Sequence, residues 1–171
     1  MEQKKPALFW RGLKNFEDIS VAVLYILMTI VIFWQIIARF VLQSSLPWSE
    51  ELARYLMAWA VFIGASIAAA DGAHIGITAL VDRFSRKTSH NVRLVAVIFS
   101  LIFAILMVYL GIIIIGFLIK TGQQSPSMRI PMYIPYGSVA FGGLLMTIRF
   151  GRRAYEMIVN PPKDDNQEGV V

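Results

Sequence analysis

The sequence predicts an all-α integral membrane protein with four transmembrane helices and one or two amphipathic helices on the membrane surface. Hydrophobic residues make up 57% of the 171 residues and charged residues only 16%, whereas soluble domains carry about 25% charged residues. Four apolar runs are long enough to cross a bilayer, which takes about 20 helical residues. None of the runs alternates with the period of two that is typical of membrane barrels. Because backbone groups in lipid must be paired within their own segment, the runs are predicted to be helices.

The bounds of the four spans follow from the charged and proline residues that interrupt the apolar runs. The third run is longer than a bilayer requires, so we expect it to cross with a tilt. The fourth opens with Pro131 and Pro135, which helix starts tolerate, and it closes at Arg149. The predicted spans cover residues 19–38, 52–70, 94–119 and 130–148.

Two further segments are amphipathic but too polar to span. Residues 8–18 and 75–88 place apolar side chains at helical spacing and most of their charges elsewhere on the helix, which predicts interfacial helices. Either the lipid surface or the edge of a partner protein would suit their apolar faces. Residues 1–160 are therefore predicted to form a single four-helix transmembrane domain. The polar residues 161–171 are predicted to be a disordered cytoplasmic tail.

The distribution of basic residues predicts the orientation. Lys and Arg gather before the first span, between the second and third spans, and after the fourth. Only three basic residues, Arg39, Lys120 and Arg129, lie in the other connections. Cytoplasmic loops carry the excess of basic residues, so both termini and the central loop are expected in the cytoplasm. The remaining charges are predicted to form solvated flanks.

The composition also excludes several function classes. The chain has no cysteine, which removes disulfides, thiol catalysis, iron–sulfur clusters and cysteine-based zinc sites. It contains no Walker A sequence and no motif for nucleic-acid binding. No predicted span carries a buried acid–base pair, an acidic cation site or a broken helix, and the spans offer almost nothing polar at mid-depth. A complete sodium-driven carrier needs oxygen ligands for the ion and a polar site at that depth. We therefore expect neither an enzyme nor a cofactor-binding chain.

The most distinctive polar cluster opens the second span. Ser49 is placed to cap this helix, and two acids follow in its first turn, where the helix dipole favours carboxylates. Arg54 is three and four residues beyond them, so the three charges can share one face. Two interpretations fit this pattern. One is an ordinary helix start that an interfacial tryptophan anchors, and the other is a polar clamp, a set of charged and polar side chains that fixes this chain to a partner protein. The residues of this cluster are Trp48, Ser49, Glu50, Glu51 and Arg54.

Other features are less specific. Ala60, Gly64 and Ala68 are four residues apart, a spacing that favours close helix packing, either within this chain or against a partner. His74 follows the second span. Its side chain is a candidate member of the polar clamp, or a hydrogen-bond donor to the carbonyl groups at the end of that helix. Arg39, Tyr133 and Tyr136 are expected to anchor the outer membrane interface.

Together these residues resemble a known family. The order Trp48-Ser49-Glu50-Glu51, Arg54, Gly64 and His74 is similar to the small membrane subunit, DctQ-like, of tripartite ATP-independent periplasmic transporters. The segment 130–136 that opens the last span is also similar to that family.

The resemblance implies a small subunit in the bacterial inner membrane. It implies a large polytopic partner that carries the substrate and sodium, and a periplasmic substrate-binding protein that delivers an organic acid such as a C4-dicarboxylate or a sialic acid. The small subunit would brace the scaffold of the large one among membrane lipids. Two alternatives remain open at this point. A redox membrane anchor would need haem ligands, for which the chain offers only two histidines, and a small self-assembling exporter would need an acid within a span.

Overall fold

The protein folds into long helices only, in the part of the chain that the computed structural model describes, residues 8–44, 46–70 and 86–159. The helices are α1 (Leu8–Phe40), α2 (Pro47–Ala70), α4 (Arg86–Thr121) and α5 (Tyr133–Val159). The all-α prediction is confirmed. Three of these helices contain segments long and apolar enough to cross a membrane, Asn15–Phe40, Pro47–Ala69 and Thr88–Thr121.

The helix α5 is not one of these three candidates. Four glycines, three tyrosines and Arg149 lie within it, and they make it less apolar than the other helices. Its position explains this composition. α5 contacts α2 on one side and α4 on the other, so much of its surface faces protein rather than lipid.

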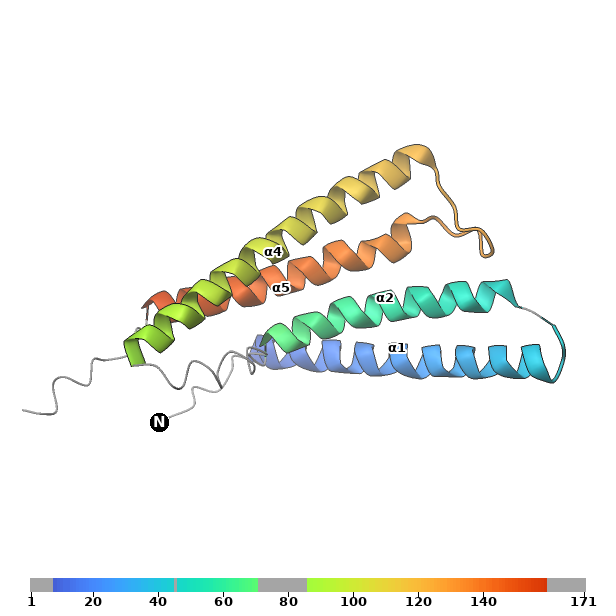
Figure 1. The fold of residues 1–171 in the computed structure, drawn as a ribbon, viewed down its shortest axis with the longest axis horizontal. Coiled ribbons are helices and arrows are strands. Elements are labelled where there is room, and N and C mark those ends of the chain that lie inside the picture. The colour runs from blue at the N-terminus through green and yellow to red at the C-terminus, as the bar shows by residue number, and fades with distance from the viewer. Residues whose placement is uncertain (1–7, 45, 71–85, 160–171) are drawn as a thin grey trace, which may run out of the picture.

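The helices lie in a row rather than in a closed bundle. α1 packs on α2, α2 on α5, and α5 on α4, whereas the edge helices α1 and α4 do not approach each other (Figure 1). α1 consequently exposes large apolar side chains along its length, among them Ile26, Ile30 and Phe33, and α4 does the same with Phe99, Ile102 and Phe103. A soluble protein would not leave such surfaces in water.

The two ends of the row carry different parts of the chain. The loop end carries the connections 41–46 and 122–132, and the terminal end carries the start of α1 and the end of α5 (Figure 1). Residues 8–18 do not form a separate interfacial helix. They continue without a break into the first predicted span as part of α1, because no proline or glycine pair interrupts the helical pattern between them. The predicted interfacial helix at 75–88 lies mostly outside the described residues.

Two kinds of contact hold the centre of the row. Glycines of α5 allow close approach, since a Cβ on Gly142 would lie 2.6 Å from the Cβ of Phe62 on α2, and one on Gly143 would lie 3.1 Å from a methyl of Val108 on α4. Aromatic rings add to this, with Trp59 and Phe141 5.9 Å apart between their centroids. α2 and α5 are therefore the packed core of the row.

Candidate functional site

Glu51 joins α2 to the connection between α4 and α5 at the loop end. Its side chain is 2% exposed. One carboxylate oxygen accepts the backbone N–H groups of Ser127 at 2.9 Å and Met128 at 3.3 Å, and the other accepts the hydroxyl of Tyr55. Hydrogen bonds to an ionised acceptor are stronger than neutral ones. We call this set of contacts the Glu51 latch.

The sequence of the connection 122–132 folds it into a shape that presents these N–H groups. Gly122 and Arg129 have positive φ, 63° and 53°, which turns the chain back on itself. Ser125 donates its N–H to the carbonyl of Ile130 at 2.9 Å, and its hydroxyl accepts the N–H of Ile130 at 3.2 Å. The closed loop leaves two neighbouring N–H groups pointing at one carboxylate.

The other residues of the predicted cluster take separate directions. Glu50 is exposed and accepts a hydrogen bond from the Gln35 amide of α1 at 3.1 Å. Arg54 is exposed, and it forms neither an ion pair nor a hydrogen bond with the described part of the chain. The three charges therefore do not meet on one face, because Glu50 turns to α1 and Glu51 to the α4–α5 loop.

Two further residues of this cluster also have defined positions. The expectation that Ser49 caps α2 is wrong. The helix begins two residues earlier, at Pro47, a favoured residue at a first helical position. The buried Ser49 hydroxyl donates to the Leu46 carbonyl at 2.7 Å. Trp48 is 39% exposed, so it remains available to lipid or to a partner.

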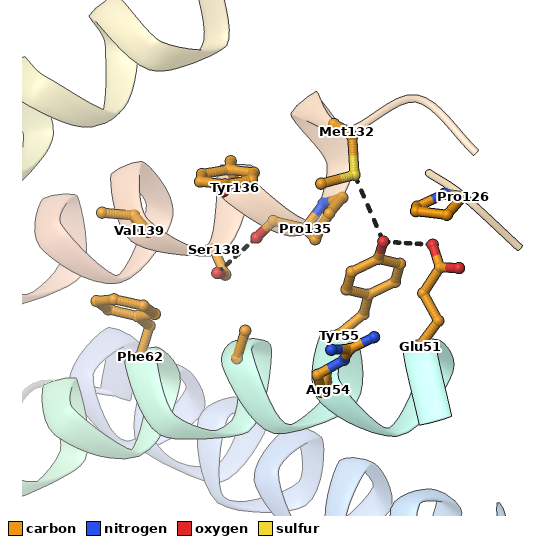
Figure 2. Close-up of a pocket in the computed structure, with 11 residues that line it drawn as sticks. Glu51, Arg54, Tyr55, Phe62, Pro126, Met132, Pro135, Tyr136, Ser138 and Val139 are labelled. Atoms are coloured by element: carbon orange, nitrogen blue, oxygen red, sulfur yellow. Dashed lines mark hydrogen bonds between the residues drawn. The ribbon is translucent and has the colours of Figure 1, made fainter. Parts of the chain in front are cut away.

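A pocket of about 410 Å³ opens between α2 and α5 beside the Glu51 latch. Glu51, Arg54 and Tyr55 lie at one end of it (Figure 2). Apolar side chains from both helices and from the connection 122–132 form the rest of the lining, together with Tyr136 and Ser138. Ser138 donates to the carbonyl of Pro135 at 2.7 Å, so its hydroxyl is occupied. The pocket thus has one charged end and an apolar body.

A second polar contact closes the terminal end of the row. Glu17 of α1 pairs with Arg149 of α5, and it accepts the Ser66 hydroxyl of α2 at 3.4 Å. Glu17 is 1% exposed and Arg149 7%. We call these three residues the terminal-end lock.

The lock corrects the expectation that such charges form solvated flanks. It also places a buried acid–base pair beside spans that were expected to hold none. Glu17 lies just before the predicted span 19–38, in the apolar segment Asn15–Phe40 of α1, and Arg149 lies just after the predicted span 130–148. The charges are too far apart in sequence for any local pattern to pair them. The sequence does contain one indication of the pair. An acid lies near the start of the first apolar run and an arginine near the end of the fourth, and these two ends are predicted to lie on the same side of the membrane.

The small residues of α2 have mixed roles. Ala60 is buried at 1% exposed, but a Cβ on Gly64 would meet nothing within 4 Å, and Ala68 is exposed. Gly64 and Ala68 therefore do not serve close packing within the described chain, and packing against a partner stays a prediction. The glycines that bring helices together are Gly111, Gly142 and Gly143, which the sequence analysis missed.

The remaining predicted residues lie at the loop end or outside the described residues. Arg39, Tyr133 and Tyr136 are exposed at the loop end, where interface anchors were expected. His74 lies outside the described residues. No group of three or more His, Cys, Asp or Glu that could hold a metal occurs in the described ranges.

These features define a multi-pass membrane protein whose described residues form helix contacts and apolar surfaces rather than a catalytic centre. Comparison with known proteins gives the family. The model for the DctQ component of tripartite ATP-independent periplasmic (TRAP) transporters matches residues 28–160. The chain belongs to this family, as its sequence motifs predicted.

Curated relatives of the chain are small permease proteins of TRAP transporters. The chain is 31% identical to the sialic acid TRAP transporter small permease protein SiaQ of Vibrio cholerae, over 80% of this chain and 78% of that protein. It is 26% identical to the C4-dicarboxylate small permease protein DctQ of the same organism, over 84% and 72%. It is 26% identical to the ectoine small permease protein TeaB of Halomonas elongata, over 81% and 72%. These relatives are transporter permease subunits, so the prediction that the chain is not an enzyme is confirmed.

Proposed function

We propose that this chain is the small transmembrane subunit of a sodium-driven, binding-protein-dependent transporter for an organic acid, and that it braces the scaffold of a large transport subunit in the bacterial inner membrane. The family match over residues 28–160 carries the proposal. The substrate class comes from relatives named for sialic acid, C4-dicarboxylate and ectoine. Sodium and substrate are bound by the large subunit, and this chain holds no cofactor.

In the proposed arrangement all four helices cross the membrane, with α5 as the fourth span. The loop end faces the periplasm and both termini lie in the cytoplasm. The basic residues support this orientation, because Arg149, Arg152 and Arg153 follow the apolar part of α5 at the terminal end and cytoplasmic flanks are rich in basic residues. The periplasmic substrate-binding protein docks at the loop end.

The open row of helices supports a bracing role. A row has two edges and two broad faces, and its apolar side chains are exposed on α1 and α4. Lipid covers part of this surface and the large subunit covers the rest. The contacts between α2 and α5, with a polar contact at each end, keep the row in one shape.

Among the predicted clamp residues, Trp48, Glu50 and Arg54 are exposed and are proposed to lie near the partner. Ser49 and Glu51 act indirectly by holding the start of α2 and the loop. His74, Gly64 and Ala68 are further candidates for the partner interface.

Co-purification tests the proposal. The tagged chain, expressed together with the large permease and the binding protein of its transporter, should recover the large permease, and cells without the chain should lose uptake. The double variant Trp48→Ala, Glu50→Gln should reduce recovery, whereas Glu156→Gln at the terminal end serves as the matched control. Sodium-driven uptake by this chain alone in vesicles would contradict the proposal.

A further inference from the structure

The pocket between α2 and α5 has a cation, Arg54, at its charged end. Glu51 is occupied by Ser127, Met128 and Tyr55. Arg54 lines the same end (Figure 2), and among the residues that the structure describes it has neither an ion-pair nor a hydrogen-bond partner. Ionisable side chains at membrane depth normally find a partner. Arginine is suited to phosphate, which it binds with two parallel N–H groups.

Most of the remaining pocket lining is apolar and runs along the helices. Ala58 and Phe62 follow Arg54 on α2, and Pro135 and Val139 face them from α5. Arg54 and Phe62 are eight residues apart, which corresponds to about 12 Å of helix. One leaflet of hydrocarbon is about 15 Å deep, so this apolar trough spans most of a leaflet.

A polar end that carries an arginine, followed by an apolar trough, matches one class of ligand. We propose that the pocket binds a glycerophospholipid, with its phosphodiester against Arg54 and one acyl chain between α2 and α5. An acidic side chain of a partner protein would satisfy Arg54 but would leave the trough empty. The proposal rests on the proposed placement of the loop end at a membrane surface.

Native mass spectrometry of the full-length chain, purified and stripped of lipid in detergent, tests the proposal without any partner subunit. Dioleoylphosphatidylglycerol should bind as a one-to-one adduct, and dioleoylglycerol, which has the same chains without the phosphate, should not. Arg54→Gln should weaken phospholipid binding about tenfold, the effect of losing one charged hydrogen bond. Ala58→Phe, which fills the trough, should abolish the adduct.

Arg39→Gln is the matched control, because Arg39 is also exposed at the loop end but does not line the pocket. It should leave binding unchanged. Equal binding by wild type, Arg54→Gln and Arg39→Gln would overturn the proposal, and so would equal binding of the two lipids. Failure here would leave co-purification with the large permease unaffected, so the two proposals fail separately.

Discussion

At the scale of single residues, two adjacent acids have different roles. Glu51 is buried and accepts two backbone N–H groups from a loop 76 and 77 residues away. Glu50 is exposed and accepts one hydrogen bond from Gln35. The sequence places both in the first turn of one helix and offers no way to distinguish them, because the distinction depends on where the α4–α5 loop folds.

Glu51→Gln should loosen that loop. The amide nitrogen of glutamine cannot accept an N–H, and the remaining oxygen carries no charge, so the contacts with Ser127 and Met128 weaken. Hydrogen exchange followed by mass spectrometry should show faster exchange across 122–132, with a thermal midpoint a few degrees lower. Glu50→Gln, one residue away, should change neither. Unaltered exchange in Glu51→Gln would mean that the loop holds its shape without the carboxylate.

At the scale of helices, the existence of all four could be predicted from the sequence, but their order in the row could not. Apolar runs identify α1, α2 and α4 because length and hydropathy are local properties. The central position of α5 depends on which glycines meet which partner helix. Gly142 and Gly143 adjoin each other in the chain, yet they contact α2 and α4 respectively. The regular spacing of Gly64 with its neighbouring alanines predicted close packing there instead, but a Cβ on Gly64 would meet only open space.

Gly142→Ala and Gly64→Ala should therefore have opposite effects on stability. An added Cβ at Gly142 would lie 2.6 Å from the Phe62 Cβ and 2.8 Å from its carbonyl oxygen, so the backbones must separate, at a cost of about 1–3 kcal/mol. At Gly64 the added methyl meets nothing, and alanine should stabilise the helix by about 0.5–1 kcal/mol. Unfolding of the isolated chain in mixed micelles measures both. Equal destabilisation by the two changes would contradict the observed order of helices.

At the scale of the whole molecule, the row consists of two helix hairpins, α1–α2 and α4–α5, joined along α2 and α5. The Glu51 latch ties the hairpins at the loop end, and the terminal-end lock ties them at the other. Glycine contacts lie between these two polar ends. This arrangement gives a thin protein a fixed shape without a closed core, which suits the proposed bracing role.

The terminal-end lock should therefore dominate the stability of the whole row. Glu17→Gln leaves the Arg149 charge buried without its partner, and breaking a buried pair from one side typically costs about 3–5 kcal/mol. Arg149→Met should cost a similar amount. The double variant should cost less than the sum of the two, because no buried charge then remains. Unfolding of the full-length chain in mixed micelles provides all three values.

The exposed pair Arg152–Glu156 supplies the matched control. Its side chains are 42% and 54% exposed, and its atoms are 2.7 Å apart on one face of α5. Solvent weakens such a pair to about 0.3–0.5 kcal/mol, so Glu156→Gln should hardly change stability. If Glu17→Gln lowered the free energy of unfolding no more than Glu156→Gln does, burial of the terminal-end lock would contribute nothing to stability. Among the described residues, the glycine contacts, the Trp59–Phe141 ring contact and the Glu51 latch would then hold the two hairpins together.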